Sequence, residues 1–159
     1  MNKHIVIILI SMTLMLQAVS SVSAAQTKVI ITFDDGWTSD YYKALPIMQT
    51  NNQQGTVFII TGEVAGGTGR QGFEYMNMSQ LKALYSAGWD LSSHTVTHPF
   101  LTNLTKLKNT SQLNTELRNS KNWLNSSGFT RASMFLAYQY LRIVLSFSMK
   151  STDIGYRLG

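Results

Sequence analysis

The stretch Ile30-Ile31-Thr32-Phe33-Asp34-Asp35-Gly36 decides the fold, because a short apolar run ends there in two adjacent carboxylates. Its β-branched residues predict a strand over residues 28–33 that is buried on both faces, as in a parallel sheet. Gly36 suits the turn that follows, since glycine readily adopts positive φ. In parallel α/β proteins functional groups gather where strands end. Asp34 and Asp35 therefore stand where a site would form.

Strand and helix patterns alternate along the rest of the chain. Further strands are predicted over residues 56–61, 89–92 and 134–138, and another begins near residue 156. Helices are predicted over residues 40–51, with a kink or break at Pro46, over 80–87, capped by Ser79, and over 112–126 and 143–149. Residues 63–72 hold four glycines and are predicted to form a loop. This alternation implies an α/β fold with a parallel sheet or barrel.

Two histidines lie four residues apart in Ser93-His94-Thr95-Val96-Thr97-His98-Pro99, directly after the predicted strand over residues 89–92. The carboxyl ends of parallel strands meet at one edge of a sheet, so this pair is expected beside Asp34 and Asp35. Imidazole and carboxylate groups are common zinc ligands. Because the chain has no cysteine, a metal would be held by nitrogen and oxygen atoms alone. The two motifs together predict a mononuclear metal site.

Each motif also has an ordinary structural interpretation. Two histidines at this spacing can simply be solvated on a helix face, and Asp-Asp-Gly after a strand is often no more than a turn. Aromatic residues near the motifs could stack on a sugar ring or could be core residues: Trp37, Tyr41, Tyr42 and Trp89. Finding both polar motifs at strand ends favours a shared site over two unrelated features.

Composition indicates a single globular domain. The chain has 159 residues, of which 44% are hydrophobic and 13% charged, so it can build a core and is unlike a disordered tail. The formal charge of +5 is carried by scattered residues, and Lys106 and Lys108 come closest to a cluster. This pattern is not a nucleic-acid footprint, so no nucleic-acid partner is predicted.

The N-terminal residues 1–24 are predicted to be a signal peptide. Lys3 precedes an apolar stretch over residues 5–19, and the small residues Val22 and Ala24 fit a cleavage site after Ala24. The stretch is shorter than the roughly 20 residues of a membrane span. A secreted or cell-surface protein without stable membrane insertion after cleavage is therefore expected, with residues 25–159 as its domain.

Both motifs resemble those of a known family. Thr32-Phe33-Asp34-Asp35-Gly36 and His94-Thr95-Val96-Thr97-His98-Pro99 look like the first two motifs of the polysaccharide deacetylases, the chitooligosaccharide deacetylase-homology family of carbohydrate esterases. The likeness extends from about residue 28 to residue 140. It implies a distorted β/α barrel of the glycoside hydrolase/deacetylase type, a divalent metal that is usually zinc, and an acetylated polysaccharide as substrate.

The resemblance also implies a role for each matching residue. Asp35, His94 and His98 would bind the metal, which leaves open positions for water and for the acetyl carbonyl. Asp34 would act as the general base that takes a proton from the water. Tyr140 matches the tyrosine of the family's third motif, whose backbone N–H binds the oxyanion of the substrate.

The sequence departs from the family after this point. The third motif reads Ala137-Tyr138-Gln139-Tyr140-Leu141, in which Gln139 and Leu141 stand where the family has proline and glycine. The fourth and fifth motifs have no counterpart, including the histidine that acts as general acid. Residues 25–159 are therefore interpreted as a partial catalytic domain with an incomplete barrel. Two alternatives stay open: an inactive glycan-binding or vestigial homologue that retains only the metal site, and a hydrolase of a different ester or amide.

Overall fold

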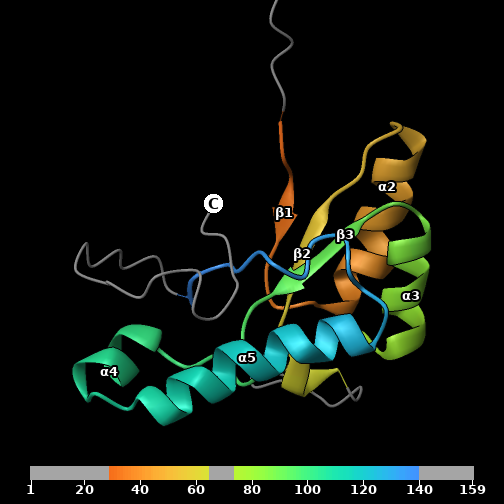
Figure 1. The fold of residues 1–159 in the computed structure, drawn as a ribbon. Coiled ribbons are helices and arrows are strands. Elements are labelled where there is room, and N and C mark those ends of the chain that lie inside the picture. Colours follow the sequence, from red (N-terminus) through yellow and green to blue (C-terminus); the bar gives the residue numbers. More distant parts are fainter. Residues whose placement is uncertain (1–28, 65–73, 140–159) are drawn as a thin grey trace, which may run out of the picture.

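The protein's structure, a computed structural model, describes residues 29–64 and 74–139. Three parallel strands and their connecting helices make up this part of the chain (Figure 1). The elements, in chain order, are β1 (Thr32–Phe33), the π-helical turn η1 (Asp40–Ala44), α2 (Leu45–Thr50), β2 (Thr56–Ile59), the 3-10 turn η2 (Thr61–Glu63), α3 (Met78–Ser86), β3 (Asp90–Ser93), α4 (Leu101–Lys106) and α5 (Thr110–Ser126). The predicted signal peptide, the elements predicted at 143–149 and near 156, and Tyr140 lie outside the described residues.

The strands form one sheet in the order β1-β2-β3, and both pairs are parallel. Thr32 pairs with Thr56, and Ile59 pairs with Ser93, so the three strands end close to one edge of the sheet. Each parallel connection passes through a helix, which is the β/α order that the sequence pattern predicts. The polar motifs at residues 34–36 and 94–98 both follow strands at this edge.

The first predicted strand is shorter and less buried than expected. Only Thr32 and Phe33 pair with β2, because β2 begins at Thr56 opposite Thr32. Val29 and Ile30 are 80% and 79% exposed, so the prediction of a strand buried on both faces is wrong. Within the described residues, β1 has a neighbour on one side only, and an edge strand does not bury its apolar side chains fully.

The predicted strand over residues 134–138 is reduced to a single bridge. Leu136 pairs in parallel with Ser93, through hydrogen bonds from Ser93 N to Phe135 O (3.2 Å) and from Ala137 N to Ser93 O (3.0 Å). The prediction of a regular strand is wrong because β3 ends at Ser93. The next N–H that would face residues 134–138, that of Thr95, donates to Ser93 Oγ instead (3.1 Å). The bridge still places residues 135–137 beside β3, where a fourth barrel strand would run.

Helix boundaries follow local capping chemistry. The helix predicted over residues 40–51 is divided into η1 and α2, and Pro46 lies in the first turn of α2, where its missing N–H is tolerated. The start of α3 is capped by Asn77 and not by Ser79, because Asn77 and Gln80 form a reciprocal capping box. The short helix α4 was absent from the prediction, since six residues carry too little periodicity to be recognised.

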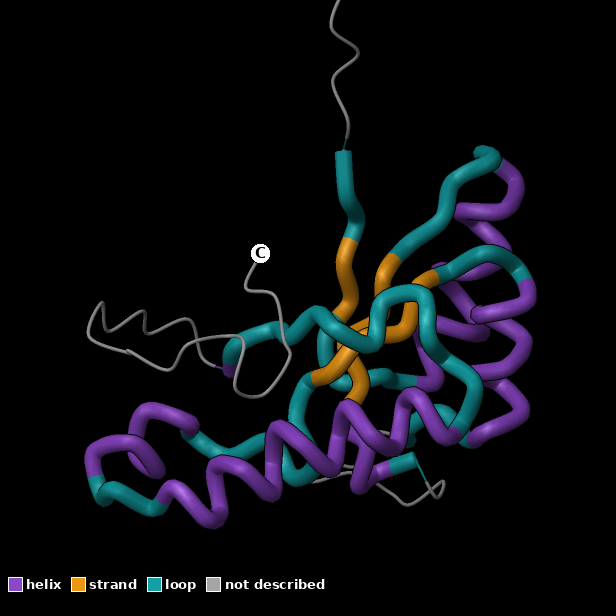
Figure 2. Tube along the Cα trace, in the orientation of Figure 1, coloured by secondary structure: helices purple, strands orange, loops and turns teal. Residues whose placement is uncertain are grey.

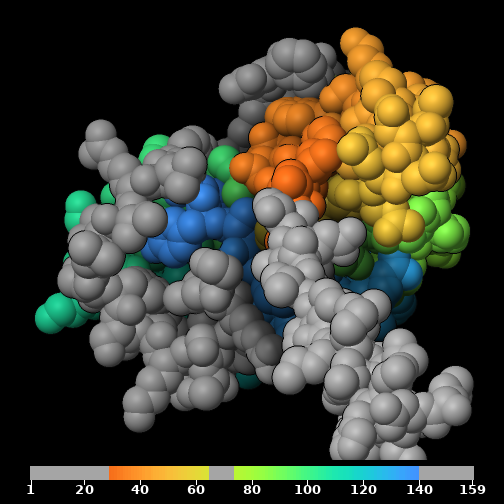
Figure 3. All heavy atoms as spheres, turned by 90° about the horizontal axis from the view of Figure 1, so that it is seen from above, coloured from red at the N-terminus to blue at the C-terminus, as the bar shows by residue number. Residues whose placement is uncertain are grey.

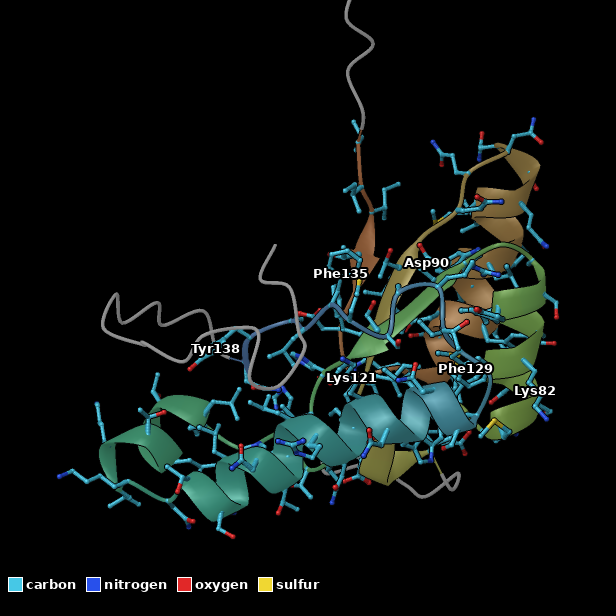
Figure 4. All side chains as sticks on the ribbon, viewed as in Figure 1. Lys82, Asp90, Lys121, Phe129, Phe135 and Tyr138 are labelled. Carbon is cyan, nitrogen blue, oxygen red and sulfur yellow. The ribbon has the colours of Figure 1, made fainter. Side chains whose placement is uncertain are left out.

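The main core lies where α2, α3 and α5 pack against β2 and β3 (Figures 1 and 2). Phe129 lies between α5 and α3, as the side-chain view shows, and Lys82 points outward from α3 (Figure 4). The largest side chains that are fully buried include Trp89, Leu91 and Leu124. In the space-filling view, residues from β1 to β2 form one contiguous block (Figure 3). A second apolar cluster joins α4 to α5 through Leu101, Leu104, Leu113 and Leu117.

No helix in residues 29–64 and 74–139 is both long enough and apolar enough to cross a membrane.

Replacing Leu124 with alanine is expected to lower the free energy of unfolding by about 2–5 kcal/mol, because the side chain is fully buried and leaves a cavity. Leu107→Ala is the matched control: Leu107 is 77% exposed, so its loss is expected to change stability by no more than about 0.5 kcal/mol. Urea unfolding of both variants followed by circular dichroism measures the difference. Equal effects of the two substitutions would contradict this packing.

Candidate metal centre

The candidate site lies at the carboxyl edge of the sheet, where the three segments that follow the strands are joined by backbone hydrogen bonds. After β2, Thr61 N donates to Thr95 O (3.0 Å) and Gly62 N donates to Val96 O (2.9 Å). Gly62 allows this approach, since a Cβ there would lie 2.5 Å from Val96 O. The loop that follows β3 is thereby fixed against the end of β2, and it carries both histidines.

Three side-chain atoms converge at this edge. Asp35 Oδ1 lies 3.5 Å from the Nε2 atom of His94 and 3.5 Å from that of His98, and the two nitrogens lie 3.0 Å apart. These residues form a group whose candidate donor atoms all lie within 4.8 Å of one another. The structure thus brings the predicted trio together, from the ends of β1 and β3.

The three donors suit a divalent cation. Four ligands placed tetrahedrally at about 2.0–2.1 Å from zinc lie roughly 3.3 Å from each other, close to the observed triangle. Asp35 Oδ1 is buried and accepts no hydrogen bond from the described residues. A buried carboxylate oxygen without a donor is costly, and a cation between it and two imidazole nitrogens would remove that cost.

A backbone carbonyl sets the tautomer of His94. Its Nδ1 atom lies 3.0 Å from Ala137 O, which can only accept a hydrogen bond. Nδ1 therefore carries the proton, and the lone pair of Nε2 faces Asp35 and His98. Carbonyl partners of this kind orient metal-binding histidines in many proteins. The residue that supplies the carbonyl belongs to the segment that bridges to β3 at Leu136.

Arg131 anchors that segment to the rest of the fold. Its guanidinium carbon lies 3.6 Å from the centre of the Tyr85 ring, and its Nε donates to Asp90 Oδ1 (3.1 Å). Asp90, labelled in Figure 4, begins β3, so the anchor joins the segment to both α3 and β3. Ala137 itself is fixed by the hydrogen bond from its N–H to Ser93 O (3.0 Å).

Unusual backbone conformations shape both motifs. Asp35 and Gly36 have φ values of 71° and 87°, which turn the chain sharply after β1. Thr95 and His98 also have positive φ values, of 69° and 59°. Positive φ is uncommon for residues other than glycine, and such strain is frequent at functional sites. The observation supports a functional interpretation of these two turns.

Comparison with known proteins identifies the family. The sequence model of the polysaccharide deacetylases, described as "Polysaccharide deacetylase", matches residues 21–158. The chain belongs to the polysaccharide deacetylase family. The resemblance predicted from the two motifs is therefore confirmed.

Two proteins whose names describe them as deacetylases are similar to this chain. YxkH of Bacillus subtilis (strain 168), a relative named as a polysaccharide deacetylase, is 28% identical over 131 residues, which are 82% of this chain and 43% of YxkH. The Streptococcus pyogenes deacetylase PplD, solved in complex with acetate, is 26% identical with a TM-score of 0.66, covering 91% of this chain and 61% of PplD. The chain thus spans less than two thirds of the length of each.

A third likeness concerns the fold. The family 4 carbohydrate esterase from Streptomyces lividans, also in complex with acetate, is 22% identical with a TM-score of 0.64, covering 85% of this chain and 62% of that one. The predicted fold class, an incomplete β/α barrel of the deacetylase type, is confirmed by these structures. The three parallel strands and the bridge at Leu136 are the part of the barrel that the described residues form.

Two further residues of the motifs, the predicted general base Asp34 and Gln139, lie outside the donor group. Asp34 is exposed and is not a member of the donor group, although it precedes Asp35 directly. Gln139, which departs from the family's third motif, is 3% exposed, and its amide donates to His94 O (2.9 Å) and to Thr95 Oγ1 (3.1 Å). Glutamine in place of the family's proline is thus compatible with the observed position of the loop that carries His94 and His98.

Sequence reasoning missed three contributors to the site: Gly62, Glu116 and Ala137. Ala137 acts through its backbone, so its side chain gives no signal. Glu116 did carry a sequence signal, because it is an acidic residue within the buried stripe of α5 between Leu113 and Leu117. A carboxylate in an apolar stripe indicates a buried hydrogen-bond partner. That partner is the loop that contains His94 and His98, whose Val96 N–H donates to Glu116.

Asp40 is a second buried carboxylate near the site. Burial raises the pKa of Asp40 to about 7, and the nearby charges of Asp35 and Asp34 add to the rise. The folded chain therefore binds a proton that the unfolded chain has already lost between pH 3.8 and about 7. Stability contributed by protonated Asp40 is present at low pH and is lost as pH rises through this window.

Asp40→Asn is expected to be more stable than the wild type above this window and to lose less stability on going from acid to neutral pH. Urea midpoints measured for both proteins at pH values below and above the window test this expectation, with chelator present. Parallel pH profiles for wild type and variant would contradict the assigned role of Asp40.

Proposed function

We propose that this chain is the metal-binding part of a secreted deacetylase that removes acetyl groups from N-acetylglucosamine-containing or other acetylated polysaccharides. The convergence of Asp35 Oδ1 with the Nε2 atoms of His94 and His98 carries the proposal. Membership of the family and the acetate bound to the similar deacetylase PplD support it. Residues 1–24 are proposed to be its signal peptide and residues 25–159 its partial catalytic domain.

The proposed cation is zinc. Two imidazole nitrogens and one carboxylate oxygen are a ligand set that catalytic zinc sites use, with a further position left open. When bound, the cation would supply Lewis-acid chemistry, which polarises an acetyl carbonyl and lowers the pKa of water. The side chain of Asp35 is 26% exposed, whereas that of His94 is 3% exposed, so an acetyl group would approach from the side of Asp35.

The residues of the chain would divide the reaction between them. Asp34, which is exposed, would accept the proton of the attacking water as the new C–O bond forms at the acetyl carbon. His94 and His98 would bind the cation, and Ala137 O would keep the ring of His94 in its orientation. The backbone N–H of Tyr140 would donate to the oxyanion. Cleavage of the C–N bond would then release acetate and the free amine, which gains the proton.

A vestigial homologue is the alternative, and two observations favour it. His94 and His98, the two histidines within residues 25–159, are both assigned to the metal, so neither would protonate the leaving amine. Gln139 and Leu141 also replace the residues that the family's third motif has. A protein of this kind would bind metal and glycan without turnover.

Acetate release separates the two functions. The full chain, loaded with Zn²⁺ or Co²⁺, is expected to release acetate from chitooligosaccharides, and removal of the metal with a chelator is expected to abolish the release. Acetate is measured with an enzyme-coupled assay across a panel of acetylated glycans and simple esters. Stoichiometric metal without acetate from any substrate would favour the vestigial homologue, and release from simple esters alone would favour a different hydrolase.

A further inference from the structure

Glu116 is a buried carboxylate that is not a member of the proposed metal donor group. It lies on the buried face of α5, is 4% exposed, and is the only charged member of that face. The other buried residues of the face are Leu113, Leu117, Ser120 and Leu124. An ionised group in such surroundings requires strong hydrogen bonds to offset the loss of water.

The loop between the two histidines provides those hydrogen bonds. Glu116 Oε2 accepts from Val96 N (2.9 Å) and from Thr97 N (2.8 Å), and Oε1 accepts from the Thr97 hydroxyl (2.6 Å). Hydrogen bonds to a charged acceptor are about twice as strong as neutral ones. The Glu116 carboxylate thus accepts hydrogen bonds from two consecutive backbone N–H groups, those of Val96 and Thr97, which lie between His94 and His98 in the chain.

The loop needs support because its backbone is strained at both ends. Thr95 and His98 both have positive φ values, and strain of this kind persists only when the surroundings hold it. Gln139 and Ser93 hold the beginning of the loop at Thr95. Glu116 holds the part that leads into His98, whose Nε2 atom must lie close to that of His94 if both are to bind one ion.

We propose that Glu116 is a positioning residue that sets the metal affinity of the site by fixing His98 relative to His94. This inference rests on the proposed function, since it requires the metal. Glu116 is not itself a ligand: the donor group in the described residues comprises Asp35, His94 and His98, and both carboxylate oxygens of Glu116 are occupied by the loop.

Zinc affinity measured by titration calorimetry on the full chain tests the proposal. Glu116→Ala is expected to raise the dissociation constant for Zn²⁺ by about 10- to 100-fold, the usual effect of removing a group that orients a metal ligand. Gln80→Ala is the matched control, because Gln80 is a buried polar residue of α3 whose side chain accepts from a backbone N–H, that of Asn77, away from the site. Its dissociation constant is expected to equal that of the wild type.

Melting temperatures of the metal-free proteins separate positioning from general destabilisation. Both alanine variants are expected to melt at lower temperature than the wild type, and only Glu116→Ala is expected to bind zinc more weakly. The visible absorption of the Co²⁺-loaded protein provides a second measure, and its bands are expected to change for Glu116→Ala alone. Equal dissociation constants for Glu116→Ala and wild type would overturn the proposal.

Glu116→Gln tests whether hydrogen bonding or charge is responsible. Its amide oxygen can accept from both N–H groups, and its NH2 group can donate to the Thr97 hydroxyl, so most of the affinity is expected to return. Affinity as low as in Glu116→Ala would overturn the positioning role. If Glu116→Ala does not fold, Thr97→Val replaces only the hydroxyl donor with a methyl group and is expected to weaken zinc binding in the same direction. Unchanged affinity in that variant would count against the proposal.

Zinc binding by the wild-type chain and by Glu116→Ala also separates a failure of this inference from a failure of the proposed function. A wild-type chain that binds no stoichiometric zinc overturns both. A wild-type chain that binds one zinc ion as tightly as Glu116→Ala overturns the role of Glu116 and leaves the proposed metal site intact.

Discussion

His94→Ala is expected to abolish stoichiometric binding of zinc, raising the dissociation constant by more than the roughly 100-fold that loss of an orienting group can cause. In the wild type, the Nε2 atom of His94 is one of the three candidate donor atoms. It lies 3.0 Å from His98 Nε2 and 3.5 Å from Asp35 Oδ1. Removing one of three protein ligands leaves two donors, which are too few to hold a cation against water and chelators. Titration calorimetry and elemental analysis of dialysed protein measure the loss.

Gln80→Ala is the matched control for this experiment. Gln80 is a buried polar residue of α3 whose side chain accepts a hydrogen bond from Asn77 N, away from the site. It is not a member of the donor group. The control variant is expected to bind one zinc ion like the wild type. Full metal content in His94→Ala would contradict the assignment of His94 as a ligand.

Asp34→Asn is expected to lower the rate of acetate release by about 10²- to 10⁴-fold, the usual contribution of a general base. Metal content is expected to remain intact, because Asp34 does not belong to the donor group. Initial rates on chitooligosaccharides and zinc analysis of the same samples measure both quantities.

The neighbouring variant Asp35→Asn provides the comparison. Asp35 is the only carboxylate of the donor group, so its substitution is expected to remove both metal and activity. Comparison of Asp34→Asn with Asp35→Asn thus separates the role of a general base from that of a metal ligand. Loss of metal in Asp34→Asn, or wild-type rates in that variant, would contradict the proposed division of roles.

The location of the site could be predicted from sequence because its signals are local. The apolar run that ends at Asp34 and the histidine spacing after residues 89–92 each indicate a strand end without any knowledge of the rest of the chain. Parallel strand topology then brings the two ends to one edge. The structure places Asp35, His94 and His98 together as this argument requires.

The supporting contacts could not be predicted because they join residues distant in sequence. The hydrogen bond from Thr97 to Glu116 spans 19 residues, and the contact between His94 and Ala137 O spans 43. A partner of this kind depends on how α5 packs, which no local pattern encodes. The fourth strand was predicted wrongly for a related reason: residues 134–138 have strand-like composition, but the pairing depends on where β3 ends.

Anomalous X-ray scattering at the zinc edge, from crystals of the full chain grown with zinc, tests the central claim most directly. The account predicts one ion bound by Asp35 Oδ1 and by the Nε2 atoms of His94 and His98, at about 2.0–2.2 Å from each. An ion held elsewhere, or no ion at this edge of the sheet at saturating zinc, would contradict it.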